Sequence, residues 1–120
     1  MSGDTLDTKD AVDPIIHKGY LGELADAYVP AALDRKDPLI SPLFADLRGF
    51  PPTLIQVGSA ETLLDDAVQL ARLAGAADVR ADLQVWPEMI HVWHLFHPEL
   101  EAGRRAIEEG GAWVRGMIGR

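Results

Sequence analysis

The sequence predicts an α/β fold in which two parallel strands are flanked by helices. Residues 53–57 (TLIQV) are apolar, lie between Pro-Pro and Gly-Ser and are typical of a buried strand. Residues 81–86 (ADLQVW) form a second candidate strand that stops at Pro87, and a helical pattern over residues 62–77 separates the two. A strand–helix–strand unit of this length predicts parallel pairing. Because two strands do not complete such a layer, we expect an incomplete sheet.

Two segments are expected, a polar N-terminal segment at residues 1–12 and the α/β portion at residues 13–120. The first is acidic and has neither the basic start nor the apolar stretch of a signal peptide, so we expect a frayed terminus or the end of a loop. Apolar residues then recur at three- and four-residue intervals through residues 15–28, which predicts an amphipathic helix. Asp13 and Pro14 are expected to start it, as cap and first-turn residue.

The rest of the chain is expected to be a long loop followed, after the strand unit, by a final helix. Four of the eight prolines fall within residues 37–52, which predicts loop. Residues 99–118 have apolar side chains at helical spacing, although Gly110 and Gly111 weaken the middle of that helix.

Composition excludes several classes of protein. The 120 residues allow one small domain, and 48% of them are hydrophobic, so disorder is not expected. A net charge of −8 and the lack of a Gly-rich phosphate loop argue against nucleic acid as a partner. No apolar run approaches the roughly 20 residues of a membrane span. The absence of cysteine favours a cytoplasmic location.

A carboxylate and an imidazole follow the two predicted strands. Glu61 comes just after the first strand and His91 just after the second, 30 positions later. In open α/β sheets functional groups gather at the carboxyl ends of the strands. Glu61 can therefore accept a hydrogen bond from one imidazole nitrogen and leave the other free as a general base.

Simpler interpretations of the same residues stay open. Glu61 could simply interact with the positive N-terminal end of the helix that it precedes, without a catalytic role. His91 could be a hydrogen-bonded loop histidine. Asp65 and Asp66 are expected to support the first turn of that helix, although either could replace Glu61 as the partner of the histidine.

A metal site is a weaker alternative. The four candidates follow one another in steps of three: Glu88, His91, His94 and His97. Helical zinc motifs instead favour histidines at i and i+4, and prolines bracket this stretch as a loop, so we expect no metal. The three tryptophans are expected to line the core or a pocket: Trp86, Trp93 and Trp113.

Two stretches carry a family resemblance: DPLISPLFADLRGFPPTLIQVGSAETLLDDAVQLA and LQVWPEMIHVWHLF. They resemble the C-terminal part of the hormone-sensitive-lipase-like carboxylesterases, which have the α/β-hydrolase fold. The resemblance implies that Glu61 and His91 are the catalytic acid and histidine of a Ser-acid-His triad, acting on short- to medium-chain esters without a cofactor. It also implies that residues 81–86 can pair with a second copy of the chain.

The nucleophile of such a triad is missing from this chain. The fold places a serine in a G-x-S-x-G turn ahead of the acid and the histidine. Ser2, Ser41 and Ser59 all lack the flanking glycines. We therefore expect the C-terminal portion of an α/β-hydrolase fold that is inactive alone. The alternative is a non-catalytic remnant or an interaction or dimerisation module.

Overall fold

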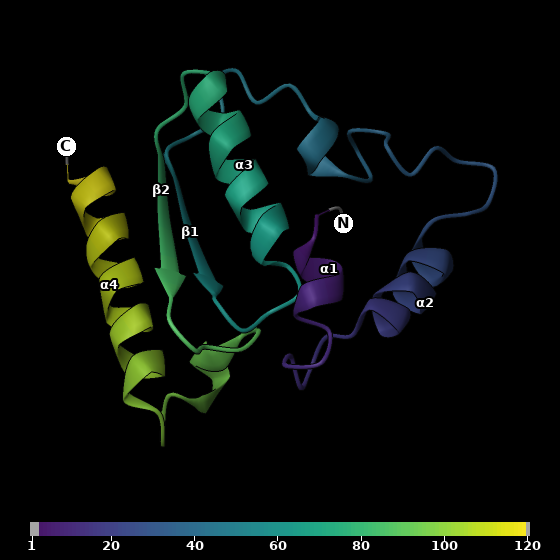
Figure 1. Ribbon diagram of the computed structural model, residues 1–120. Coiled ribbons are helices and arrows are strands. Elements are labelled where there is room, and N and C mark those ends of the chain that lie inside the picture. Colours follow the sequence, from purple (N-terminus) through teal and green to yellow (C-terminus); the bar gives the residue numbers. More distant parts are fainter. Residues whose placement is uncertain (1–2, 120) are drawn as a thin grey trace.

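The computed structural model describes residues 3–119 (Figure 1). In chain order its elements are α1 (Thr5–Thr8), α2 (Lys18–Tyr28), the 3₁₀ turn η1 (Pro42–Phe44), β1 (Thr53–Gly58), α3 (Leu64–Ala76), β2 (Ala81–Trp86), the 3₁₀ turn η2 (Trp93–Phe96) and α4 (Glu101–Ile118). Within the described part of the chain, no helix is long and apolar enough to cross a membrane.

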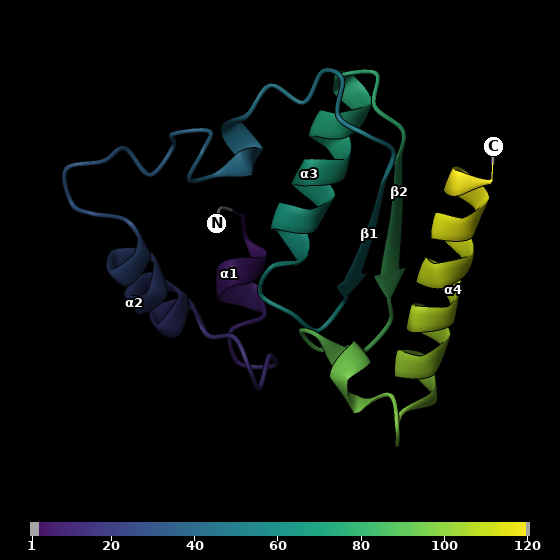
Figure 2. The same cartoon turned by 180° about the vertical axis from the view of Figure 1, so that it is seen from behind.

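The two strands form a parallel pair with helices on both sides. The register runs from Thr53 opposite Ala81 to Gly58 opposite Trp86. Helices α3 and α4 flank the sheet on opposite sides in both views (Figures 1 and 2). The α/β fold, the parallel pairing and the flanking helices predicted from the sequence are confirmed. Over residues 3–119 the sheet has these two strands and no others.

Each face of the sheet has its own packing. On the α3 side, Leu47, Ala74 and Val79 form a buried apolar cluster. The α4 side includes polar contacts: the Gln56 amide donates to the Gln84 side chain at 2.8 Å and to the Ala106 carbonyl of α4 at 2.9 Å. Satisfied polar groups of this kind tolerate burial, and they fix the position of α4 against β1.

The predicted start of the first long helix is wrong. Helix α2 begins at Lys18, and Asp13 does not cap it. The Asp13 side chain is 1% exposed and points inward, where one carboxylate oxygen accepts hydrogen bonds from the backbone N–H groups of Ile15 and Ile16. Those bonds close a local turn, so the chain bends after Asp13 and the helix starts later.

Residues 1–12 were expected to be a frayed terminus or the end of a loop, and this is wrong for residues 5–8, which form α1. Thr5 lies in α1, is buried and bonds to the first turn of α3. Its backbone N–H donates to Asp65 Oδ2 at 2.9 Å, while Asp65 N–H donates to Thr5 Oγ1 at 3.0 Å. This reciprocal pair resembles a capping box made by a distant segment, and it satisfies free N–H groups of both partners. Met1 and Ser2 lie outside the described residues, and a division of the chain at residue 12 stays a prediction.

Candidate active site

Glu61 and His91 meet at the carboxyl edge of the two-stranded sheet. Glu61 lies in the turn between β1 and α3, and His91 lies in the loop after β2. The distance from Glu61 Oε1 to His91 Nδ1 is 3.5 Å. That is long for a hydrogen bond, as catalytic pairs without substrate often are. The two residues that the sequence predicts as partners are thus brought together.

The carboxylate of Glu61 is held through both of its oxygens. While Oε1 faces His91, Oε2 accepts a hydrogen bond from the backbone N–H of Gly58 at 3.1 Å. The residue is only 5% exposed. Burial raises the pKa of Glu61 above its ordinary value; the Gly58 N–H group and His91 oppose that rise, and the charge of Asp13 adds to it.

With Glu61 ionised, this contact defines which nitrogen of a neutral His91 carries the proton. An ionised Glu61 can only accept, so Nδ1 of the neutral imidazole is the donor and Nε2 is left as an acceptor. The side chain of His91 is 27% exposed. An oriented imidazole with an unprotonated Nε2 is the arrangement that a general base requires.

The two loops that carry these residues are joined through their backbones. Ser59 N–H donates to the Trp86 carbonyl at 2.9 Å, and Ala60 N–H donates to the Met89 carbonyl at 3.0 Å. In return, the Ser59 hydroxyl accepts from Glu88 N–H at 2.8 Å. Ser59, the serine closest in sequence to Glu61, therefore links the loops. The sequence did not predict this role.

Unusual backbone conformations lie on both sides of His91. Glu88 has φ of 62° and Val92 has φ of 50°, both in the left-handed region. For a β-branched residue such as Val92 this conformation is a genuine outlier. Strained residues of this kind concentrate at sites where the chain must be held in one conformation, and no sequence pattern indicated them.

The other carboxylates near the turn have different contacts. Asp65 exchanges hydrogen bonds with Thr5, and both Asp65 and Asp66 lie in the first turn of α3, as the sequence predicts. Negative side chains at that position favour the helix because its N-terminal end is positive.

The residues considered for a metal are separated. His91 faces Glu61, whereas His94 Nε2 lies 2.9 Å from Gln56 Oε1, and burial lowers the pKa of His94. Among residues 3–119, no group of three or more His, Cys, Asp or Glu side chains could hold a metal ion. Of the three tryptophans, Trp93 is 1% exposed and lies 5.8 Å from Trp86 between ring centroids.

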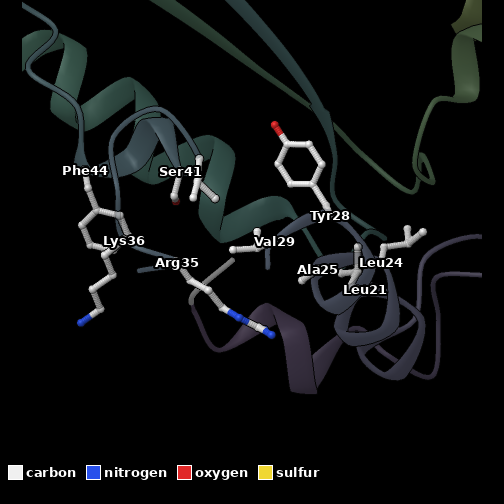
Figure 3. Close-up of a pocket in the computed structure, with 10 residues that line it drawn as sticks. Leu21, Leu24, Ala25, Tyr28, Val29, Arg35, Lys36, Ser41 and Phe44 are labelled. Atoms are coloured by element: carbon white, nitrogen blue, oxygen red, sulfur yellow. The ribbon is translucent and has the colours of Figure 1, made fainter. Parts of the chain in front are cut away.

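A separate apolar hollow lies away from this pair. It has a volume of about 520 Å³ and is formed by α2 and the segment that leads to η1 (Figure 3). Its apolar walls include Leu21, Tyr28 and Phe44, and neither Glu61 nor His91 lines it. A smaller hollow of about 300 Å³ does include Glu61, together with Leu63 and Leu70.

Known proteins are similar to this chain in sequence and in fold. The family described as "alpha/beta hydrolase fold" matches residues 2–95. An acetyl-hydrolase of Streptomyces hygroscopicus is 46% identical over 112 residues, which cover 93% of this chain and 37% of that protein. An esterase of Acinetobacter venetianus is 37% identical over 82 residues, covering 68% of this chain and 27% of the esterase.

Solved structures of other proteins also have this fold. A crystal structure of an esterase from the bacterial hormone-sensitive lipase family superposes with a TM-score of 0.94 at 44% identity, over 98% of this chain and 39% of that one. A hormone-sensitive lipase from a metagenome library gives 0.92 at 40% identity, over 97% and 40% of the two chains.

These matches define a hydrolase fold of the layered α/β type. The chain belongs to the α/β-hydrolase fold family, and within it to the branch of hormone-sensitive-lipase-like carboxylesterases. It spans about two fifths, or less, of the length of the relatives that it matches.

Proposed function

We propose that this chain supplies the acid and the general base of a serine-type carboxylic-ester hydrolase, with Glu61 as the acid and His91 as the base. The observation that carries the proposal is the contact of Glu61 Oε1 with His91 Nδ1 at the carboxyl edge of the sheet. Its supporting context is the similarity to proteins named acetyl-hydrolase and esterase, which favours acetyl and other short-chain esters.

In this reaction the hydroxyl of a serine outside these 120 residues attacks the ester carbonyl. His91 Nε2 takes the serine proton and then delivers it to the departing alcohol, which leaves an acyl-enzyme. Water, deprotonated by the same nitrogen, then releases the acid and restores the serine. Glu61 stabilises the imidazolium that forms in each step and keeps Nδ1 protonated.

Three observations support a nucleophile from elsewhere. The sequence contains no G-x-S-x-G turn, and the relatives are more than twice as long as the matched stretch. Large apolar side chains are also left in water over the described residues, with Tyr28, Leu39 and Ile118 among the most exposed. Exposed apolar surface of this kind favours a site where another part of a protein packs.

A chimaera tests the proposal. The chain replaces the matching stretch of the Streptomyces hygroscopicus acetyl-hydrolase, and hydrolysis of p-nitrophenyl acetate and butyrate is measured. The chain alone should release no p-nitrophenol above a denatured control, because the three groups of a triad act as a unit. The chimaera should be active, and His91→Ala should abolish that activity.

His97→Ala is the matched control, since His97 is exposed and six residues away on the same segment. It should leave the chimaera active. A folded chimaera that His91→Ala does not impair contradicts the assignment of the base. Hydrolysis by the chain alone that depends on His91 contradicts the missing nucleophile and directs attention to Ser59.

The second candidate function is an interaction or dimerisation module, with self-association through β2. The specific observation is the outer edge of β2, which no other strand within residues 3–119 pairs with and where Val85 is 45% exposed. Unpaired edges recruit other strands unless they are short, charged or covered.

For the location, the lack of cysteine supports a cytoplasmic protein.

A further inference from the structure

Asp13 is a buried carboxylate that joins two distant parts of the chain. One oxygen, Oδ1, serves the local turn by accepting from Ile15 and Ile16 at 3.0 and 2.9 Å. The other oxygen, Oδ2, accepts from the backbone N–H of Thr62 at 3.1 Å, across 49 positions of sequence. A carboxylate that accepts three backbone N–H groups is a strong and directional anchor.

The remote end of this anchor is the residue that follows Glu61. Thr62 N–H belongs to the peptide group that joins Glu61 to Thr62, so Asp13 holds that peptide plane. The Thr62 side chain is fully buried, and its hydroxyl donates to the Ile16 carbonyl at 3.3 Å. Rotation of this peptide would turn the Glu61 side chain away from both Gly58 N–H and His91.

We propose that Asp13 is a positioning residue for Glu61: through Thr62 N–H it sets the turn so that Oε1 of Glu61 faces Nδ1 of His91. The consequence for catalysis rests on the proposed function, whereas the geometric role does not. The hydrogen bonds of Asp13 go to backbone N–H groups of Ile15, Ile16 and Thr62 and not to the imidazole, so it acts through Glu61.

The direct readout is the tautomer of His91, measured on this chain alone by the ¹⁵N shifts of its ring in alkaline buffer. The unaltered chain should hold the Nδ1–H form, because Glu61 accepts from that nitrogen. Asp13→Asn replaces one carboxylate oxygen by an NH₂ group. If that group faced Ile15 and Ile16 it would oppose two N–H donors, so it should face the single N–H of Thr62 and break that hydrogen bond. The Nδ1–H form of His91 should then become the minor one.

Two control variants separate positioning from general stability. Asp34→Asn makes the same exchange in an exposed turn, where Asp34 accepts from Lys36 N–H, and should leave the tautomer unchanged. Thr5→Val removes the hydroxyl that bonds to Asp65 N–H and to the Thr62 carbonyl, while the bond from Thr62 N–H to Asp13 remains. It should lower the urea midpoint but keep the Nδ1–H form.

The proposal is overturned if Asp13→Asn keeps the tautomer of the unaltered chain, or if Thr5→Val changes it equally. If Asp13→Asn does not fold, Asp13→Ser is judged by the same criterion, since its hydroxyl can serve the local turn without reaching Thr62. In the unaltered chain, a through-hydrogen-bond coupling between the Thr62 amide nitrogen and the Asp13 carboxyl carbon should be present, and its absence also overturns the proposal. None of these measurements requires esterase activity. An inactive chimaera would therefore contradict the proposed function without contradicting the role of Asp13.

Discussion

Gly58 and Met89 are in backbone contact, although β1 and the loop after β2 are far apart in the sequence. A Cβ atom on residue 58 would lie 2.0 Å from the carbonyl oxygen of Met89 and 2.5 Å from its carbonyl carbon. No side chain could move aside to make room, because both atoms belong to the backbone. The contact of Glu61 with His91 therefore depends on a residue without a side chain at the end of β1.

Gly58→Ala is expected to destabilise the chain. The added methyl group forces the loops apart, and overpacking of this kind costs roughly 1–3 kcal/mol. Urea unfolding measures the change. Gly116→Ala is the matched control: nothing lies within 4 Å of a Cβ there and the residue is in α4, so the same exchange should stabilise by about 0.5–1 kcal/mol. Equal effects of the two variants would contradict the close approach.

Val92→Asn is expected to stabilise the chain by roughly 1 kcal/mol, because asparagine tolerates the left-handed conformation that valine resists. Val92 is 36% exposed, so little apolar burial is lost. The urea midpoint should rise. Val68→Asn, at a residue of α3 that is 42% exposed, should lower it instead. A fall in both variants would show that residue 92 is not strained.

The parts of the fold that the sequence predicted are those with a local pattern. The strand at residues 81–86 has its predicted bounds, because Pro87 ends it and its composition is typical of strands. The meeting of Glu61 and His91 was also predictable, since the carboxyl ends of neighbouring parallel strands lie at one edge.

The remaining features of the site depend on contacts that no local pattern contains. An aspartate before a proline is a common helix start, yet Asp13 turns inward because Thr62, far along the chain, offers it a donor. Thr5 likewise lies in a polar segment without periodicity and is ordered by its bonds to Asp65. The left-handed conformation of Val92 contradicts the preference of valine, so sequence reasoning would exclude it.

Glu61→Gln should change stability in a pH-dependent way. Burial raises the pKa of Glu61 in the folded chain, so the folded state holds the proton more tightly than the unfolded one. The associated stabilisation is complete below the ordinary value of 4.5 and is lost as the pH rises through the raised pKa. The free energy of unfolding of the variant, relative to the unaltered chain, should therefore increase across that window and then level off.

Urea unfolding at a series of pH values checks this, because the other carboxylates are present in both proteins and largely cancel. A difference that does not vary with pH would contradict the burial of a charged Glu61. In the chimaera, the same variant should lose about 10⁴-fold in activity, because a glutamine can donate to Nδ1 and favour the wrong tautomer of His91.

The outer edge of β2 should make the chain self-associate. Ser59 N–H donates to the Trp86 carbonyl and Thr53 N–H to the Arg80 carbonyl, so the even-numbered residues of β2 direct their backbone groups towards β1. By the two-residue period of a strand, Ala81, Leu83 and Val85 direct theirs outward. No other strand within residues 3–119 covers them.

Val85→Pro tests this edge because it removes an outward N–H group while leaving the pairing with β1 intact. Proline is tolerated on an edge strand in that orientation, so the variant should still fold. Sedimentation of the unaltered chain should show dimers or larger species, and Val85→Pro should shift them towards the monomer. Val85→Thr keeps the N–H group and the β-branched shape, so it should associate like the unaltered chain. A stable monomer that neither variant changes would refute β2 as a pairing edge. If association persists equally in Val85→Pro, the association occurs through another apolar surface, such as the exposed side of α4 around Ile118.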